Sequence, residues 1–336
     1  MKRYLYLYIV ALASIFATSC NHKELCEDAR MYHINLHADY RLDWEDTNDI
    51  DWKSPGCWPE HYLAYDNLRP NIPDELLLAW DYKNGRANYL NYTKPGGGVI
   101  NLGNEYTNLL IHNDSEYNDI HYSSDGTIVR ATTRTSTRAS FTGYKLGEVK
   151  EETKKSPDML FANYCSDYIS YKTLGPVDFH VELQPLVFTY KVRYEFAEGL
   201  EYVALARGAL SGMAESVIMD TGETSSTGAT IVYDCDLTDF GARALVKSFG
   251  IPGFPNPNYP MTRATKHGLN LEVMLRNGKL VTFNFDVTDQ VNAQPHGGVI
   301  VVDGIVVKKE DGVQGSGAFD VVVDDWGPYE DIVLPL

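Results

Sequence analysis

The sequence predicts an all-β protein composed of two tandem β-sandwich domains. Its 336 residues are enough for two domains at about 150 residues each. Two long stretches alternate apolar and polar residues with the period of two that is typical of half-buried strands. The 23 tyrosines outnumber the 12 phenylalanines and five tryptophans together, and aromatic residues are enriched in strands. Because hydrophobic residues make up 44% and charged residues 22% of the chain, a wholly disordered protein is excluded.

The first 19 residues have the features of an export signal. Lys2 and Arg3 precede an uncharged, mostly apolar stretch at 4–16, which is too short to span a bilayer, because a spanning helix needs about 20 apolar residues. The small residues Ala-Thr-Ser then lead to Cys20, a pattern that resembles the lipobox of bacterial lipoproteins. We therefore expect a signal peptide at 1–19 and lipid attachment at Cys20. The alternative is an ordinary secretory peptide whose cleavage site lies beside a cysteine.

We expect the mature chain to be held at the membrane by this lipid alone. Removal of residues 1–19 leaves 317 residues (336 − 19) and a formal charge of −19, because Lys2 and Arg3 are lost from a chain of net charge −17. No second apolar segment of spanning length occurs in the sequence. Several acyl chains on one cysteine suffice for stable anchoring.

The first domain is expected at 20–174 and begins with a long strand. Residues 32–42 place Tyr, Ile, Leu, Ala, Tyr and Leu on one face and His, Asn, His, Asp and Arg on the other, which predicts a half-buried strand. Turn residues separate the shorter strands, which are expected at 75–80, 99–102, 107–112 and 127–131. The acidic segment 43–58 and the charged segment 150–157 are interpreted as loops.

The second domain is expected at 175–336, because Gly175 and Pro176 are boundary signals. A second alternating run follows, with one apolar face formed by Leu186, Phe188, Tyr190, Val192, Tyr194 and Phe196. We expect these six side chains to face one core. Further strands are expected at 202–206, 229–233, 269–276, 279–287, 299–302 and 319–323.

Other segments of the second domain carry turn and helix signals. Asn277-Gly278 predicts a type I′ hairpin, in which both central residues have positive φ. The spacing of apolar residues over 237–249 predicts a short connecting helix. The proline-rich segment 253–260 predicts a loop, because proline cannot donate to a strand ladder.

The sequence contains no G-x-S-x-G elbow, H-E-x-x-H pair, Walker loop or G-x-G-x-x-G fingerprint, so we expect no catalytic residues and no cofactor. His33 and His37 would lie about 13 Å apart on one strand face, too far for a single metal ion. The acidic segment 43–51 lacks the glycine and terminal glutamate of an EF-hand and is interpreted as a solvated loop. The glycine triplet 96–98 is interpreted as a flexible loop, since no Lys-Ser/Thr follows it. We therefore expect no metal site.

A nucleic-acid partner is also not expected. The net charge of −17 repels phosphate backbones unless a local basic stripe overcomes it. The single basic stretch contains Arg130, Arg134 and Arg138 in a Ser/Thr-rich run without interleaved aromatic residues. We interpret this stretch as an exposed, protease-sensitive loop.

Two other function classes stay open at this point. A glycan-binding protein would need an exposed aromatic platform, for which Trp44, Trp52 and Trp58 are candidates. A β-sandwich hydrolase would need two well-placed carboxylates, which sequence alone does not single out among 46 acidic residues. Cys26 and Cys57 would either form a disulfide in an oxidising periplasm or be buried thiols.

Several segments together resemble the fimbrillins and fimbrium-anchoring lipoproteins of type V pili. They are LGNEYTNLLIHN at 102–113, YVA at 202–204 with LSGMA at 210–214, FDVTDQV at 285–291 and FDVVVDDW at 319–326. The resemblance implies two transthyretin-like sandwiches, an acylated N-terminal cysteine and a role in pilus assembly. We expect an outer-membrane location at the cell surface, and the periplasmic face is the alternative. The resemblance also implies pilin subunits as partners, joined through strand pairing.

The family contains two kinds of subunit. Pilin members are trimmed by an arginine-specific protease, which opens a groove for a neighbour's donor strand, whereas anchor members keep their lipid and hold the pilus base. In this chain Arg30 precedes the strand at 32–42 and Arg41 lies near its end. Because a strand buried in a sandwich resists proteolysis, we expect the strand to stay in the mature protein. The sequence thus favours a non-catalytic anchor or terminal subunit.

Overall fold

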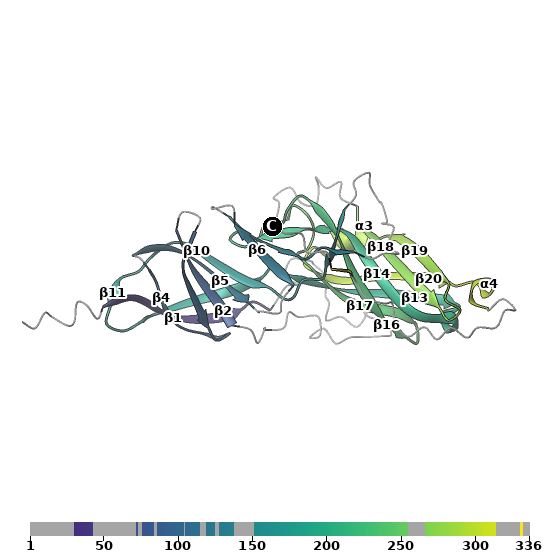
Figure 1. Cartoon of the computed structure of the whole chain (residues 1–336), viewed down its shortest axis with the longest axis horizontal. Coiled ribbons are helices and arrows are strands. Elements are labelled where there is room, and N and C mark those ends of the chain that lie inside the picture. Colours follow the sequence, from purple (N-terminus) through teal and green to yellow (C-terminus); the bar gives the residue numbers. More distant parts are fainter. Residues whose placement is uncertain are drawn as a thin grey trace, which may run out of the picture.

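The computed structural model describes residues 30–42, 72, 76–83, 86–103, 105–114, 119–124, 128–137, 151–254, 266–313 and 330–331. Strands dominate these residues and form two sandwich-like units that lie end to end (Figure 1). The first unit runs from purple to teal in Figure 1 and the second from green to yellow. The predicted all-β class is confirmed.

The first unit consists of two facing layers that share one strand. Its strands are β1 (Met31–Tyr40), β2 (Leu76–Lys83), β3 (Arg86–Thr93), β4 (Gly97–Asn101), β5 (Tyr106–Asp114), β10 (Phe161–Ile169), β11 (Lys172–Thr173) and β12 (Val177–Pro185). Their order is β11-β1-β12-β10-β5-β2-β3, and β4 pairs with β1. Strand β12 joins the layers, because it pairs with β1 as far as Leu183 and then with β10 at Gln184 and Pro185.

The core of the first unit lies between these layers. Buried side chains of β1 and β4 meet those of β5, β10 and β12, namely Ile34, Leu36, Ile100, Leu109, Ile111, Phe161, Val181 and Leu183. Each strand contributes alternate residues, because successive side chains of a strand point to opposite faces. The first unit therefore depends on β1 for one wall of its core.

The second unit has the same plan. Its elements are β13 (Phe188–Glu198), η4 (Leu200–Tyr202), β14 (Val203–Ala214), β16 (Gly228–Thr238), β17 (Gly241–Ser248), β18 (Gly268–Leu275), β19 (Leu280–Asp286), α3 (Thr288–Asn292), β20 (Gly298–Val306) and α4 (Lys309–Gly312). Their strand order is β19-β18-β14-β16-β17-β13-β20. Here β16 is the shared strand, which pairs first with β14 and then with β17. Its core is lined by Tyr190, Val192, Tyr194, Leu210, Leu269, Leu271 and Ile300 among others.

Short strands connect the two units. They are β6 (Ile120–Ser124), β7 (Val129–Thr133), β8 (Ser136–Thr137), β9 (Glu152–Lys155), β15 (Ser216–Ile218) and β21 (Glu330–Asp331). Strand β15 pairs with β7, and β9 adds in parallel to β16. A separate apolar cluster draws on both units, including Leu110, Leu160, Val187, Val217 and Phe249. The units are therefore joined through strand pairing and a shared core.

The chain passes from the first unit to the second at a point beyond the domain break predicted near residue 175. Gly175 and Pro176 precede β12, which pairs with β1 and β10 in the first unit. The second unit begins with β13 at Phe188. The glycine–proline signal marks the start of a strand, because its local chemistry sets a turn and does not report the sheet that follows. Whether 20–174 and 175–336 behave as separate domains stays a prediction.

The second alternating run divides its six apolar residues among different surroundings. Tyr190, Val192 and Tyr194 are fully buried in the second core, as predicted. Leu186 instead belongs to the apolar cluster between the units, and Phe188 is half-buried beside the ring of His296. The opposite face of β13 is also covered, since Lys191 and Arg193 are buried. The prediction of one common core is therefore wrong for this strand.

Two predicted irregular or helical segments are strands in the structure. The segment 237–249 contains β17, whose buried Ala242, Ala244 and Val246 recur with a period of two, so the predicted helix is wrong. The charged segment 150–157 contains β9, which is held by its pairing with β16. This polar sequence forms a strand because β16, which is distant in the sequence, supplies its main-chain hydrogen-bonding partners.

Two further segments and one turn also differ from expectation. Arg130 lies in β7, between β6 and β15, whereas Arg134 is exposed outside the strands. Gly96 lies in a turn, but Gly97 and Gly98 belong to β4, so the loop prediction is wrong for Arg130 and for these two glycines. The turn between β18 and β19 includes Gly278 with φ +80°, whereas Asn277 does not adopt positive φ. Leu275 N–H donates to Lys279 O at 2.8 Å. This is a three-residue hairpin loop with its glycine in the left-handed region, and the predicted type I′ turn is wrong.

Candidate assembly site around strand β1

Strand β1 is held by hydrogen-bonded neighbours along both of its sides. It runs parallel to β12, from the pair Ile34–Val177 to the pair Tyr40–Leu183. On its other side it runs antiparallel to β4, where Leu36 faces Gly98. Its first residues also pair with β11. Removal of β1 would therefore expose an edge of β4 and an edge of β12 on the two sides of an open groove.

The apolar face of β1 fills one side of the first core, as the alternation predicts. Ile34 and Leu36 are each 1% exposed. Tyr32, Ala38, Tyr40 and Leu42 are partly buried against the same core. The Tyr40 ring meets the ring of Phe161 edge-on with centroids 5.1 Å apart, and its hydroxyl donates to Pro95 O at 3.0 Å. The groove that β1 occupies is therefore apolar along its floor.

Gly97 lets β4 approach β1 closely. It has φ +102°, and a Cβ atom at this position would lie 2.0 Å from the carbonyl oxygen of Leu36. Real Cβ atoms do not come this close to backbone, so any larger residue would push the two strands apart. Gly96, its neighbour, has no such contact within 4 Å. The glycine triplet thus has a structural role at one position of the groove.

The polar face of β1 is tied to β12. Asn35 Nδ2 donates to Asp178 Oδ1 at 2.8 Å, and His37 Nε2 lies 2.8 Å from the same oxygen. The hydrogen bonds from His37 and then Asn35 lower the pKa of the Asp178 carboxyl. The rings of His37 and His180 stack with centroids 4.5 Å apart. Because His37 and Asp178 are largely exposed, their ion pair contributes less than the apolar face does.

The two arginines that flank β1 differ in accessibility. Arg30 is exposed before the first strand residue. Arg41 is half-buried, its N–H donates to Leu183 O at 2.9 Å, and its guanidinium donates to Gln184 Oε1 at 3.4 Å. Burial, followed by the charge of Arg41, lowers the pKa of His296 to about 4. Arg41 is therefore held against β12 directly after β1 ends.

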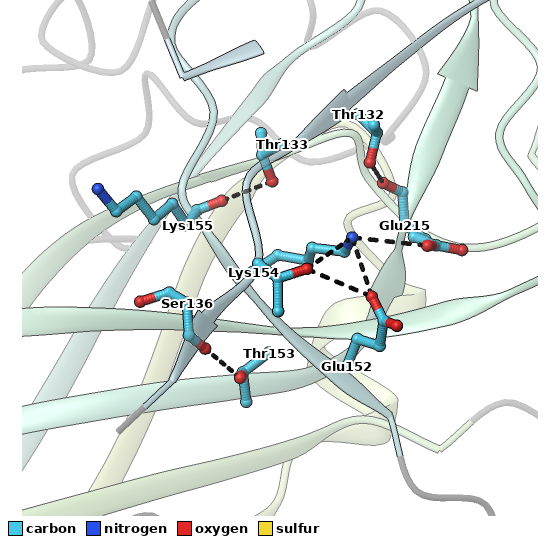
Figure 2. Close-up of polar contacts among 9 residues, drawn as sticks. Thr132, Thr133, Ser136, Glu152, Thr153, Lys154, Lys155 and Glu215 are labelled. Carbon is cyan, nitrogen blue, oxygen red and sulfur yellow. Dashed lines mark hydrogen bonds and ion pairs between the residues drawn. The ribbon is translucent and has the colours of Figure 1, made fainter. Parts of the chain in front are cut away.

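A second polar cluster surrounds Lys154 (Figure 2). Lys154 Nζ lies 3.0 Å from Glu152 Oε2 and 3.6 Å from Glu215 Oε1, and its side chain is 8% exposed. Thr132 Oγ1 donates to Glu215 O at 3.0 Å, and the hydroxyl of Thr153 donates to Ser136 O. Lys154 belongs to β9 and Glu215 lies between β14 and β15. The cluster therefore connects the crossing strands to the second unit.

Several residues singled out from the sequence lie outside the described residues. These are Cys20, Cys26, Cys57, Trp44, Trp52, Trp58 and Arg138. His33 and His37 lie on the polar face of β1. Cys165 and Cys235 are half-buried in β10 and β16, and burial followed by the charge of Asp167 raises the pKa of the Cys165 thiol. Within the described ranges, no group of three or more His, Cys, Asp and Glu side chains could hold a metal ion, and no helix has the length and apolarity needed to cross a membrane.

The chain has a relative that matches along its whole length. It is 21% identical over 367 aligned residues, covering 100% of both chains, to a Bacteroides ovatus protein named "Putative fimbrium anchoring subunit Fim4B". The predicted resemblance to fimbrium-anchoring proteins is confirmed. Residues 75–234 of the chain also match the family described as a domain of unknown function, DUF5119.

A solved structure agrees with the fold of this chain. A crystal structure described as a "putative adhesin" from Bacteroides ovatus superimposes with a TM-score of 0.53 at 16% identity, covering 87% of this chain and 99% of the other. The fimbrial anchor protein Mfa2 from Porphyromonas gingivalis has a TM-score of 0.40 at 10% identity, covering 80% and 90%. The first of these comparisons shows that the two-unit β architecture occurs in a crystal structure.

Sequence reasoning missed three parts of the site. The role of Gly97 depends on the approach of β1, which lies more than fifty residues earlier in the chain. Asp178 and Lys154 carry no sequence signal, because each acquires its partner through long-range strand pairing. The period-two pattern of β1 was the one local signal that located the groove.

Proposed function

We propose that this chain is a non-catalytic, lipid-anchored structural subunit of a cell-surface fimbria that acts as an anchor or terminal subunit. Its lipid would be attached at Cys20 in the outer membrane, and its partners would be pilin subunits that join it by strand pairing. The full-length relative named as a fimbrium anchoring subunit supports the fimbrial role.

The position of β1 is the observation that carries the anchor assignment. The strand is paired on both sides and buries Ile34 and Leu36. Burial of each such side chain stabilises the fold by about 1.5–3 kcal/mol relative to exposure. A subunit that keeps β1 also keeps the covalent connection from its folded part to Cys20. This connection is what an anchor requires.

Contacts within the chain support strand pairing as the mode of assembly. Strand β9 extends the second unit by pairing with β16, and β15 of the second unit pairs with β7. Both contacts join separate parts of the protein by main-chain hydrogen bonds. A partner's strand would use the same kind of contact, since sheet edges accept added strands.

The anchor assignment can be tested by locking β1 in place. Asn35 and Asp178 are directly opposite each other in β1 and β12. A disulfide in the double variant Asn35→Cys, Asp178→Cys would prevent β1 from leaving. We expect the locked protein to support fimbria formation at the wild-type level, with each single variant and the reduced double variant as controls. Loss of fimbriae in the locked protein alone, restored by reduction, would contradict the anchor assignment.

The lipid and the N-terminus need a separate measurement. We expect mass spectrometry of protein from native fimbriae to find an acylated Cys20 as the first residue, and Cys20→Ala to release the protein from membranes. An unacylated chain starting elsewhere would contradict lipid anchoring. A chain starting at Leu42 would instead identify a polymerising pilin, because cleavage after Arg41 removes β1.

A further inference from the structure

One end of the first unit exposes a group of large apolar side chains. It comprises Met31, Tyr106, Ile169, Tyr171, Leu174 and Val177, which are 45–68% exposed. We call this group the apolar tip. Exposed apolar residues that are scattered singly are normal, whereas clusters mark interaction sites.

Strand pairing brings the members of the apolar tip together. Met31 pairs with Thr173, next to Leu174, and Tyr106 pairs with Ile169. Val177 pairs with Ile34 of β1. All six residues therefore lie at the end of the first unit where β1 begins, which is the end marked by β11 in Figure 1.

The chain upstream of β1 limits how far this end can lie from the lipid. Arg30 is exposed immediately before Met31, and Cys20 lies ten residues earlier (30 − 20). Ten residues span at most about 35 Å when fully extended. An acyl group at Cys20 that enters a bilayer would therefore keep the apolar tip close to the membrane surface, whereas the second unit lies at the far end of the molecule.

The side chains of the apolar tip have the chemistry of a membrane interface. Tyr106 and Tyr171 combine an apolar ring with a polar hydroxyl, the combination that is enriched at both membrane–water boundaries. Lys172 lies among them, with its amine 5.4 Å from the centre of the Tyr32 ring. The formal charge of −19 on the mature chain, which is −17 without Lys2 and Arg3, opposes an approach to anionic lipids, so a zwitterionic surface is the better match.

We infer that the apolar tip rests in the interface of a phospholipid bilayer and orients the subunit with its second unit pointing away from the membrane. The inference rests on the proposed lipid anchor for its placement. It goes further, because it assigns a second, non-covalent membrane contact to named side chains. Interfacial binding of this kind grows with the apolar area buried.

Hydroxyl-radical footprinting read by mass spectrometry tests the inference. The protein as isolated from membranes is labelled in detergent-free phosphatidylcholine vesicles and, for comparison, the Cys20→Ala mature chain is labelled in buffer. We expect the peptides containing Tyr106, Tyr171 and Leu174 to be labelled at least fivefold less on vesicles. Leu245, which is 53% exposed in the second unit, is the internal control and should be labelled equally. Equal labelling of the tip in both samples would overturn the inference.

Matched variants give an independent measurement. The triple variant Tyr106→Ser, Tyr171→Ser, Leu174→Ser removes apolar tip side chains, and Leu237→Ser, Leu245→Ser, Val306→Ser removes exposed ones of the second unit. In the Cys20→Ala mature chain, the tip variant should lower partitioning into phosphatidylcholine vesicles at least tenfold, and the control variant should not change it. Equal partitioning of both variants would overturn the inference. So would protection of the tip by purified pilin subunits but not by vesicles, which would identify a protein-docking surface.

The two proposals fail in different ways. An unacylated Cys20 would contradict the lipid anchor, and footprinting with excess vesicles would then still test the apolar tip directly. If the protein is acylated and bound to vesicles but its apolar tip is fully labelled, the proposed lipid anchor stands and the proposed membrane contact of the apolar tip is wrong.

Discussion

The α-carbon of Gly97 packs against the carbonyl of Leu36, where a Cβ atom would come within 2.0 Å of the oxygen. This contact sets how closely β4 can approach β1. The same two strands contribute Ile34 and Ile100 to the core. The N-terminal strand is therefore held by a backbone fit as well as by apolar burial.

Replacing Gly97 should loosen β1. In Gly97→Ala the new methyl group meets the Leu36 backbone, and the φ of +102° is unfavourable for alanine. We expect the free energy of unfolding to fall by about 2 kcal/mol or more, with faster cleavage by an arginine-specific protease near β1. Urea unfolding and timed proteolysis measure both effects. Gly96→Ala is the control, because nothing lies within 4 Å of its Cβ position; equal effects of the two variants would contradict the role of Gly97.

Leu36→Ala should destabilise the first unit by about 2–5 kcal/mol, the usual cost of a leucine-to-alanine change in a core. Leu36 is 1% exposed, whereas Val99 in the neighbouring β4 is 59% exposed. Val99→Ala should therefore change stability by less than about 0.5 kcal/mol. Urea denaturation followed by tryptophan fluorescence compares the two. A neutral Leu36→Ala would show that β1 is not part of the folded core.

The Lys154 cluster should hold β9 against the segment between β14 and β15. In Lys154→Ala, Glu215 and Glu152 lose their shared cation, and we expect a loss of about 1–2 kcal/mol, since both carboxylates keep some contact with water. Thermal unfolding of Lys154→Ala should therefore occur at a lower temperature than that of the wild type. Lys155→Ala is the control on the same strand, because its side chain is 30% exposed. An unshifted transition in Lys154→Ala would contradict a stabilising role of the cluster.

Acid should destabilise the first unit through His112. Complete burial lowers the pKa of this imidazole to about 4 from 6.5. Between these two pH values the imidazole is therefore protonated in the unfolded chain and neutral in the folded chain. The free energy of unfolding should fall as the pH drops from about 6.5 to about 4, by up to about 3 kcal/mol from this group.

Unfolding measured between pH 7 and pH 4.5 tests the role of His112. His112→Gln should make the dependence of stability on pH less steep, because its amide does not titrate, and should leave the part that comes from His296, whose pKa is also lowered to about 4. His121→Gln, at an exposed residue of β6, is the control for the substitution itself. An unchanged slope in His112→Gln would assign the acid sensitivity to other groups.

The sequence by itself determined where several strands lie and which of their faces is apolar. Alternation over 32–42 located β1 and the side that carries Ile34 and Leu36, because side chains of an extended chain alternate regardless of their neighbours. The same rule located β13 and the buried Tyr190, Val192 and Tyr194. Asn277-Gly278 located a hairpin, although its turn type was wrong. These features depend on residues that are close together in the chain.

Only the tertiary structure decided which strands pair and what the polar residues do. Strand β12 pairs with β1 from 143 residues further along the chain, and this pairing moves the change of unit beyond Gly175. The second unit holds β9 and buries Lys154, although the charged sequence there predicts a loop. Strand ladders form between backbones that are distant in sequence, so the side chains of one segment do not encode its partner. Burial of Lys154 and the need for glycine at residue 97 both follow from that pairing.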